Sequence, residues 1–272
     1  MPRYFARISY VGTAYNGWQI QKNTPRTIQQ IMNERISGLL NEKIEFTGCG
    51  RTDTGVHAKE YYAHFDSVND LLAPEFYRQH HESADSDDWA YKFNSVLPYD
   101  IVVSDIFKVK DDAHARFDAR SRTYRYHITR ERDPFLVDRA YFLYAELDTD
   151  AMDLGCKTLL EYSDFSCFSK SHTQVRSNLC KIMEASCVWD ITEGSKIIFT
   201  IKADRFLRNM VRAIVGTMLE IGKGKLTLND LPKIIEGKNR SEAGISVPAH
   251  GLYLEEVNYD EELIMVKVIE GK

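Results

Sequence analysis

Cysteine is scarce in this sequence, and its spacing does not suit a structural role. The 272 residues include five cysteines, with no C-x-x-C pair and no histidine at zinc-finger spacing. Disulfide bridges and a structural zinc ion are therefore not expected. We predict that all five thiols are small buried side chains in a reducing compartment, and we assign none of them a catalytic role.

Long apolar runs are also missing. No segment reaches the roughly 20 residues that a membrane-spanning helix needs, and the first ten residues alternate between polar and apolar side chains, unlike a signal peptide. The composition, 43% hydrophobic and 28% charged, is typical of a globular chain and argues against disordered or collagen-like classes. We expect a protein of the cytoplasm that does not associate with membranes.

Three nucleotide-binding signatures are absent as well. The chain has no dinucleotide-binding glycine motif and no phosphate-binding loop with its lysine. It also lacks the basic-Gly-aromatic motif of the common RNA-recognition sheet. The sequence therefore predicts a protein that works without a redox cofactor or a nucleoside triphosphate, and it disfavours a simple RNA-binding module of that kind.

The hydrophobic pattern of the first half predicts an α+β arrangement of ferredoxin-like type. An acidic stretch with helical propensity carries Glu82, Asp85, Asp87 and Asp88. The expected elements are a strand over Arg3–Val11, a helix from an N-cap at Thr27 to Asn41, and strands over Lys43–Cys49, Glu60–Phe65 and Ile101–Val109.

The second half predicts a similar set of elements, and no segment resembles a linker. With a length prior of about two domains, we predict an N-terminal domain over 1–112 and a C-terminal domain over 113–272. The expected elements are strands over Tyr124–Thr129, Val175–Asp190 and Lys196–Ala203, a Thr-Glu-Gly turn between the last two, helices over Thr149–Glu161, Phe206–Ile221 and Asn229–Glu236, and a strand over Leu252–Val257.

Arginine is concentrated in two strips, although the net charge is −5. Six arginines lie between Arg116 and Arg132, interleaved with aromatic residues. Arg205, Arg208 and Arg212 follow i, i+3, i+7 spacing, which predicts a single face of the expected helix. Arginines on a helix are often only solvated or ion-paired. Because arginine makes planar, bidentate contacts to phosphate, the two strips together favour a structured RNA as the ligand.

A glycine-rich turn over Gly48–Ala58 contains one arginine, Arg51, and one aspartate, Asp53. Aspartate and glycine are ordinary turn residues, so this segment alone is compatible with a purely structural role. His57 has no companion at metal-ligand spacing, and we expect it to be a hydrogen-bonded structural histidine.

Several blocks of the chain resemble the TruA-type tRNA pseudouridine synthase family, and they run in the family's order along nearly the whole sequence. The two most specific are Tyr10–Gln19 (YVGTAYNGWQ) and Gly50–Ala58 (GRTDTGVHA). Further similar blocks are Asn94–Ile101 (NSVLPYDI), Ala115–Tyr126 (ARFDARSRTYRY), Asp164–Phe168, Phe206–Gly216 (FLRNMVRAIVG) and Pro248–Leu254 (PAHGLYL).

The resemblance implies two ferredoxin-like subdomains that share a central antiparallel sheet, with a basic catalytic cleft between them. It implies a homodimer that binds the anticodon stem-loop of tRNA and isomerises uridine to pseudouridine at tRNA positions 38, 39 and 40, without a cofactor. An arginine beside the aspartate would keep that aspartate ionised.

The resemblance also implies roles for individual residues. Asp53 would be the catalytic aspartate, Arg51 would help to displace the target nucleotide, and Tyr124 would stack on the extruded base. Arg212 would pair with Asp53, and Leu252 would supply an apolar wall. From the charge pattern, Arg122, Arg205 and Arg208 are expected to contact the RNA.

Two segments depart from the family pattern, namely 67–89 and 169–181, and both bear on how the rim grips RNA. Two other functions remain open from the residues alone. A glycosidase acting on nucleosides or nucleic acid would also use a carboxylate, but it generally needs a second one, and the turn offers none nearby. A non-catalytic tRNA-binding chaperone would use the same basic surface.

Overall fold

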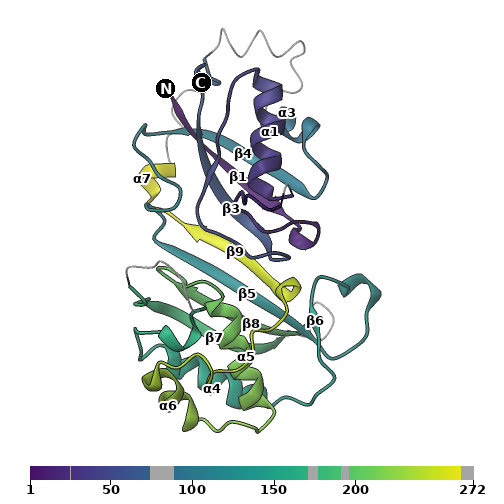
Figure 1. Cartoon of the computed structure of the whole chain (residues 1–272), viewed down its shortest axis with the longest axis vertical. Coiled ribbons are helices and arrows are strands. Elements are labelled where there is room, and N and C mark those ends of the chain that lie inside the picture. Colours follow the sequence, from purple (N-terminus) through teal and green to yellow (C-terminus); the bar gives the residue numbers. More distant parts are fainter. Residues whose placement is uncertain (25, 74–88, 171–176, 191–195, 265–272) are drawn as a thin grey trace. The chain divides into compact units, whose positions relative to one another are not determined.

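The computed structural model of the protein describes residues 1–24, 26–73, 89–170, 177–190 and 196–264. The described residues form two compact units: Met1–Arg120 together with 256–264, and Ser121–Glu255 (Figure 1). The domains predicted from the sequence were 1–112 and 113–272, whereas 113–120 and 256–264 belong to the first unit. The predicted acidic helix at 82–88 and the predicted Thr-Glu-Gly turn lie outside the described residues.

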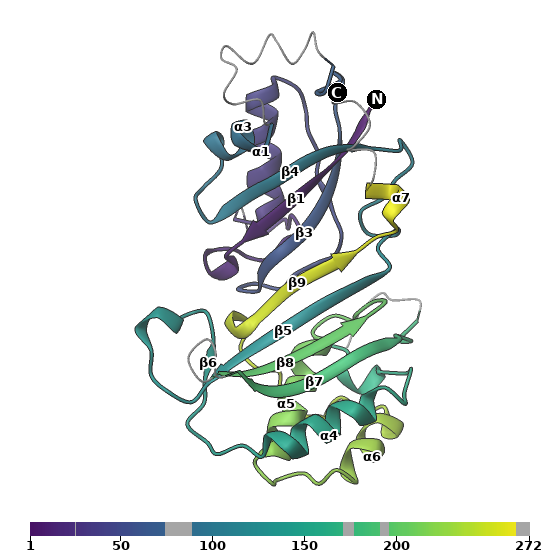
Figure 2. The ribbon, with the colours of Figure 1, turned by 180° about the vertical axis from the view of Figure 1, so that it is seen from behind.

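The first unit is a ferredoxin-like β-α-β-β-α-β arrangement. Its strands run antiparallel in the order β4-β1-β3, and β2 pairs with β3. Helices α1 and α3 lie together on one face of these strands (Figure 2). The elements are β1 (Arg3–Tyr10), α1 (Ile28–Leu40), β2 (Thr47–Gly48), β3 (His57–Asp66), α3 (Trp89–Val96) and β4 (Ile101–Val109), with a short 3-10 turn η1 (Gly12–Ala14).

Helix α1 shows how local sequence sets an element. The hydroxyl of Thr27 accepts a hydrogen bond from the backbone N–H of Gln30, which caps the first turn. The helix ends at Asn41, whose φ of 51° places it in the left-handed region. Four apolar side chains at helical spacing are buried against the sheet: Ile28, Met32, Ile36 and Leu40. The helix predicted from Thr27 to Asn41 is confirmed.

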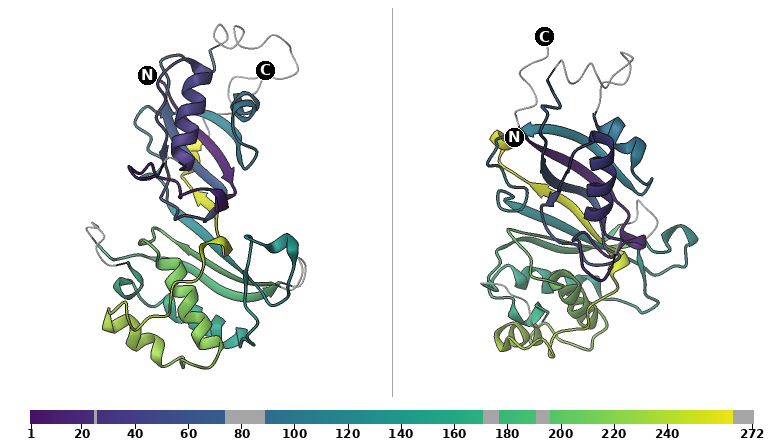
Figure 3. Two further views of the ribbon diagram at one scale, coloured as in Figure 1. Left: turned by 45° about the vertical axis from the view of Figure 1, so that its right-hand side comes forward. Right: turned by 45° about the horizontal axis from the view of Figure 1, so that its top comes forward.

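The second unit repeats the arrangement, with antiparallel strands in the order β7-β8-β5 and β9 beside β5. Figure 3 shows α4, α5 and α6 on one side of these strands. The elements are β5 (Ser121–Thr129), β6 (Tyr141–Phe142), α4 (Thr149–Leu159), β7 (Ile182–Asp190), β8 (Lys196–Ala203), α5 (Met210–Gly222), α6 (Asp230–Gly237) and β9 (Leu252–Asn258), with 3-10 turns η2 (Pro134–Leu136), η3 (Ser166–Phe168) and η4 (Ala249–Gly251); α7 (Glu261–Ile264) follows in the first unit.

The predicted α+β class with two ferredoxin-like subdomains is confirmed, but some element boundaries were wrong. The strand predicted over Lys43–Cys49 is reduced to β2. Of the strand predicted over Val175–Asp190, residues 175 and 176 lie outside the described residues, and among the rest the strand begins only at Ile182. The predicted helix over Phe206–Ile221 begins at Met210, after Asn209 in the left-handed region with φ 67°.

The late start of α5 overturns the predicted arginine face. Arg205 and Arg208 precede the helix, and only Arg212 lies on it. The reason is Asp204, whose carboxylate accepts the backbone N–H groups of Arg205 at 2.7 Å and of Lys181 at 2.8 Å. These bonds fix the segment before α5 as a loop.

The cysteines are placed as expected. All five are buried free thiols. Burial raises the pKa of the Cys167 and Cys187 thiols to about 12 in each case, so neither is a ready nucleophile. Among the described residues, no helix combines the length and apolarity needed to cross a membrane.

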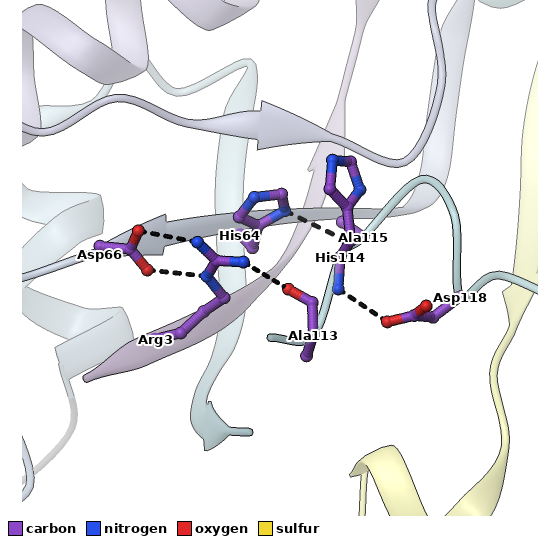
Figure 4. A network of polar contacts seen from close by, with 7 residues as sticks. All are labelled: Arg3, His64, Asp66, Ala113, His114, Ala115 and Asp118. Carbon is purple, nitrogen blue, oxygen red and sulfur yellow. Dashed lines mark hydrogen bonds and ion pairs between the residues drawn. The ribbon is translucent and has the colours of Figure 1, made fainter. Parts of the chain in front are cut away.

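A polar network fixes the loop that follows β4 to the sheet of the first unit (Figure 4). The guanidinium of Arg3 donates to both carboxylate oxygens of Asp66, at 2.7 and 2.8 Å, and to the carbonyl oxygen of Ala113 at 2.9 Å. His64 accepts the backbone N–H of Ala115 through Nδ1 at 3.1 Å. The loop is therefore anchored at two successive points.

His64 makes the stability of the first unit dependent on pH. Burial, aided by the nearby charge of Arg3, lowers the pKa of His64 to about 4. In the unfolded chain His64 takes up a proton near pH 6.5, whereas in the folded chain it stays neutral down to about pH 4. The free energy of unfolding therefore decreases as the pH falls from about 6.5 toward 4.

Replacing His64 by asparagine tests this pH dependence, because His64→Asn keeps a hydrogen-bond acceptor but cannot titrate. Between pH 7 and pH 5 the wild type should lose up to roughly 2 kcal/mol more than the variant in urea unfolding. An equal loss in both proteins contradicts this account.

Candidate active site

The turn that carries Asp53 lies in the first unit, between β2 and β3. The backbone N–H of Cys49 donates to the carbonyl oxygen of Tyr62 at 2.7 Å, and the N–H of Val56 donates to the carbonyl oxygen of Asp53 at 3.1 Å. The side chain of Asp53 is half-buried and that of Arg51 is exposed. The turn thus presents one carboxylate and one guanidinium from a hydrogen-bonded frame.

Two glycines of the first sequence block allow a second chain segment to touch this turn. A Cβ atom on Gly12 would lie 1.9 Å from the carbonyl oxygen of Val56. At Gly17, where φ is +81°, a Cβ would lie 2.4 Å from the carbonyl oxygen of Thr52. Neither site has room for a side chain. The block Tyr10–Gln19 and the block Gly50–Ala58 therefore form one structural unit.

Buried aromatic residues also contact this turn. The rings of Trp18 and Tyr61 stack with centroids 4.1 Å apart, and both residues are fully buried. The Tyr61 hydroxyl donates to the carbonyl oxygen of Gly50 at 2.5 Å. The Tyr10 hydroxyl and the Thr52 Oγ1 atom share a hydrogen bond of 2.8 Å. Since these rings have few rotatable bonds, they hold the turn in one position.

His57 has the structural role that the sequence predicts. It is buried, and its Nδ1 atom accepts the backbone N–H of Gly12 at 3.1 Å. In the part of the chain that the structure describes, no group of three or more His, Cys, Asp or Glu side chains is arranged to hold a metal ion.

The second unit carries the predicted aromatic residue on β5. The ring of Tyr124 meets the ring of Phe206 edge-on, with centroids 5.1 Å apart and an interplanar angle of 89°. Arg122 lies two residues earlier and therefore on the same face of the strand. Its guanidinium donates to the carbonyl oxygen of Asp204 at 2.8 Å, which ties Arg122 to the loop before α5.

The predicted strip of six arginines is not one uniform basic surface. Arg125 forms an ion pair with Glu255 at 3.2 Å. Arg120, in the first unit, donates through Nε to both oxygens of Asp260 at 2.9 and 3.0 Å. These two guanidinium groups are thus partly neutralised by carboxylates within the protein.

Helix α5 places Arg212 against the segment that leads into β9. The guanidinium Nε of Arg212 donates to the carbonyl oxygen of Val247 at 2.7 Å. A Cβ on Gly216 would lie 1.8 Å from the carbonyl oxygen of Ile245, so helix and segment are in close contact. Leu252, 5% exposed, begins β9. The block Phe206–Gly216 thus contacts the segment that directly precedes the block Pro248–Leu254 within the second unit.

Comparison with known proteins shows the family of this chain. Residues 156–260 match a family model described as tRNA pseudouridine synthase. A Parabacteroides distasonis protein named tRNA pseudouridine synthase A is 46% identical over 270 residues, covering 98% of this chain and 100% of the relative. Proteins of the same name from Bacteroides fragilis and Clostridium acetobutylicum are 47% and 41% identical, over 96% and 93% of this chain and 98% and 97% of the relatives.

The chain belongs to the tRNA pseudouridine synthase family. It is therefore an enzyme of an isomerase family. In this family member, the first unit holds two of the predicted site residues, Arg51 and Asp53. The second unit holds the other six, which are Arg122, Tyr124, Arg205, Arg208, Arg212 and Leu252.

Sequence reasoning missed one feature of this synthase's first unit. A cavity of about 180 Å³ lies beside the turn, and His114, Arg116 and Phe117 line it together with Gly50 and Arg51. Arg116 and Phe117 were noted only as part of the arginine strip, and His114 was not singled out. The available signal was the run His-Ala-Arg-Phe, in which an aromatic residue directly follows an arginine a few residues before β5.

The close approach at Gly12 makes a direct prediction for this synthase. Gly12→Ala places a methyl group inside van der Waals contact with the Val56 carbonyl, so it should cost about 3 kcal/mol or more, measured by urea unfolding. Gly38→Ala is the control, because Gly38 is exposed in α1 with nothing within 4 Å of the added Cβ. That variant should be stabilised by roughly 0.5–1 kcal/mol. A Gly12→Ala protein as stable as the wild type contradicts the described packing.

Proposed function

We propose that this chain isomerises uridine to pseudouridine in the anticodon stem-loop of tRNA, at positions 38, 39 and 40, with Asp53 as the catalytic carboxylate and without a cofactor. The observation that carries the proposal is the half-buried carboxylate on a turn held by two glycines, in a chain whose relatives bear the name tRNA pseudouridine synthase A. Because tRNA is the substrate, we infer that the protein acts in the cytoplasm. We also infer that it forms a homodimer.

The reaction itself suits a single carboxylate. The bond between ribose C1′ and uracil N1 breaks, the base turns, and C5 bonds to C1′. N1 gains a proton and C5 loses one, so the product has the same atoms as the substrate. An ionised Asp53 would serve as a nucleophile at C1′ or C6, or as the base that removes the C2′ proton.

The other site residues would make the target accessible. A uridine in a folded stem must be extruded, which costs a few kcal/mol of unstacking. In the proposal, Arg51 helps to displace the uridine from the stem. Tyr124 then stacks on the extruded base, which stabilises the extruded state by about 1–3 kcal/mol. Arg212 pairs with Asp53, and Leu252 forms an apolar wall. The guanidinium groups of Arg122, Arg205 and Arg208 contact RNA phosphates.

Replacing the proposed catalytic carboxylate tests the central role. Asp53→Asn keeps the shape of the side chain but removes its charge and its basicity. Pseudouridine formation in tRNA should fall by at least about 10³-fold, whereas tRNA binding should stay within a few-fold of the wild type. The measurement is nucleoside analysis of tRNA digests together with a binding titration. Asp150→Asn, at an exposed carboxylate in α4, is the matched control and should keep full activity.

The same digests separate the alternatives. Free uracil identifies a glycosidase, because hydrolysis releases the base. An unmodified tRNA, together with an Asp53→Asn protein that replaces the wild type in cells, identifies a non-catalytic chaperone. Retained base in an altered nucleoside identifies the isomerase.

The loop before α5 gives a separate prediction about RNA binding. Arg208 is exposed and Arg205 is half-buried, and a phosphate contact at either residue contributes about 0.7–0.9 to the slope of log affinity against log salt. Arg208→Glu or Arg205→Glu should weaken tRNA binding and flatten that slope. Arg35→Glu, at an exposed position of α1, is the control and should change the slope less. An unchanged slope in both loop variants removes these arginines from the RNA interface.

A further inference from the structure

The cavity beside the Asp53 turn combines Arg51 with residues to which the proposed function gives no role. Arg51 and Arg116 are both among its lining residues, and that lining contains no carboxylate. Gly50 also lines it, and a Cβ atom added there would meet nothing within 4 Å. A ligand therefore has open space next to the backbone of Gly50, and the guanidinium groups of Arg51 and Arg116 would favour an anionic group there.

An aromatic platform stands at the same cavity. Phe117 is 74% exposed, although large apolar rings are usually buried. The ring of His114 lies 4.2 Å from it, centroid to centroid, at an angle of 36°. The Arg116 guanidinium carbon lies 5.9 Å from the centroid of the Phe117 ring. One exposed ring is thus flanked by a second ring and a cation.

The exposure of Phe117 is imposed by the fold. Ala115 and Ala119, on either side of it, are buried. The polar network of Figure 4 fixes the same loop through His64 and Arg3, and Asp118 accepts the backbone N–H of His114 at 2.7 Å. With its neighbours fixed inward, the ring of Phe117 is held outward at the cavity.

We propose that this cavity binds an unpaired nucleotide directly next to the target uridine, with its phosphate between Arg51 and Arg116 and its base on the ring of Phe117. The inference rests on the proposed function. Arg51 is two residues before Asp53, so at most about 7 Å of extended chain separates their Cα atoms. A nucleotide held at Arg51 is therefore a neighbour of the one presented to Asp53. Base stacking on one ring is worth about 1–3 kcal/mol.

The test combines a protein change with an RNA change. Phe117→Ala and Phe117→Trp are made in the full chain, and tRNA binding and pseudouridine formation are measured for each. Phe117→Ala should weaken binding by roughly 5- to 100-fold, and Phe117→Trp should restore it. With an anticodon stem-loop RNA that carries an abasic ribose beside the target, Phe117→Ala should have little further effect, because the two changes remove the same contact.

The control is Phe142→Ala. Phe142 is 39% exposed, and the guanidinium carbon of Arg132 lies 5.9 Å from its ring, so it matches Phe117 in chemistry but lies in the second unit. Its loss should change binding less than twofold. Equal effects of both alanine variants, or additive effects of Phe117→Ala and the abasic ribose, overturn the proposal.

The failure of this inference and the failure of the proposed function give different results. If the wild type forms pseudouridine and Phe117→Ala changes neither binding nor KM, the cavity is not a nucleotide site, and the proposed function stands. If no tRNA is modified, but the effects of Phe117→Ala and of the abasic ribose on binding are still non-additive, the cavity binds RNA and the proposed reaction is wrong.

Discussion

The close packing of Gly12 and Gly17 against the turn that carries Asp53 is the constraint on which the rest of the first unit depends. Both glycines touch backbone carbonyl oxygens of the turn, at Val56 and Thr52, at distances that leave no space for a Cβ atom. The stacked rings of Trp18 and Tyr61 support the same turn. A reacting group must be held to within fractions of an ångström, and a turn fixed on two sides provides that precision without help from flexible side chains.

The second unit solves a similar problem with different contacts. Close packing at Gly216 and the hydrogen bond from Arg212 to Val247 join α5 to the segment that leads into β9. Asp204 holds the loop before α5 and also receives Arg122 from β5 through its carbonyl oxygen. In the first unit, the segments Tyr10–Gln19 and Gly50–Ala58, which both resemble the family, contact each other. In the proposal, the first unit supplies the carboxylate of Asp53 and the guanidinium of Arg51, and the second unit supplies the ring of Tyr124 and the other guanidinium groups.

Much of the fold follows from local sequence. The capped helix α1 and the strands β4 and β8 lie where periodicity and turn residues predict them. The errors have physical causes. The apolar pattern continues through Phe206 and Leu207, but the Asp204 carboxylate binds the backbone N–H of Arg205 directly before them, and α5 begins only at Met210. The arginine strip includes ion pairs with Glu255 and Asp260, which lie more than 100 residues away in sequence. The cavity at Phe117 depends on the contact between His64 and Ala115, which no local pattern reveals.

The central claim is that Asp53 acts on an extruded uridine. The most direct measurement is an experimental structure of the Asp53→Asn protein with an anticodon stem-loop RNA. The account predicts one uridine out of the stack, with its C1′, C2′ or C6 atom roughly 3.5 Å from the side chain at position 53 and the ring of Tyr124 against its base. An RNA bound with every uridine still stacked, or bound away from the turn, contradicts it.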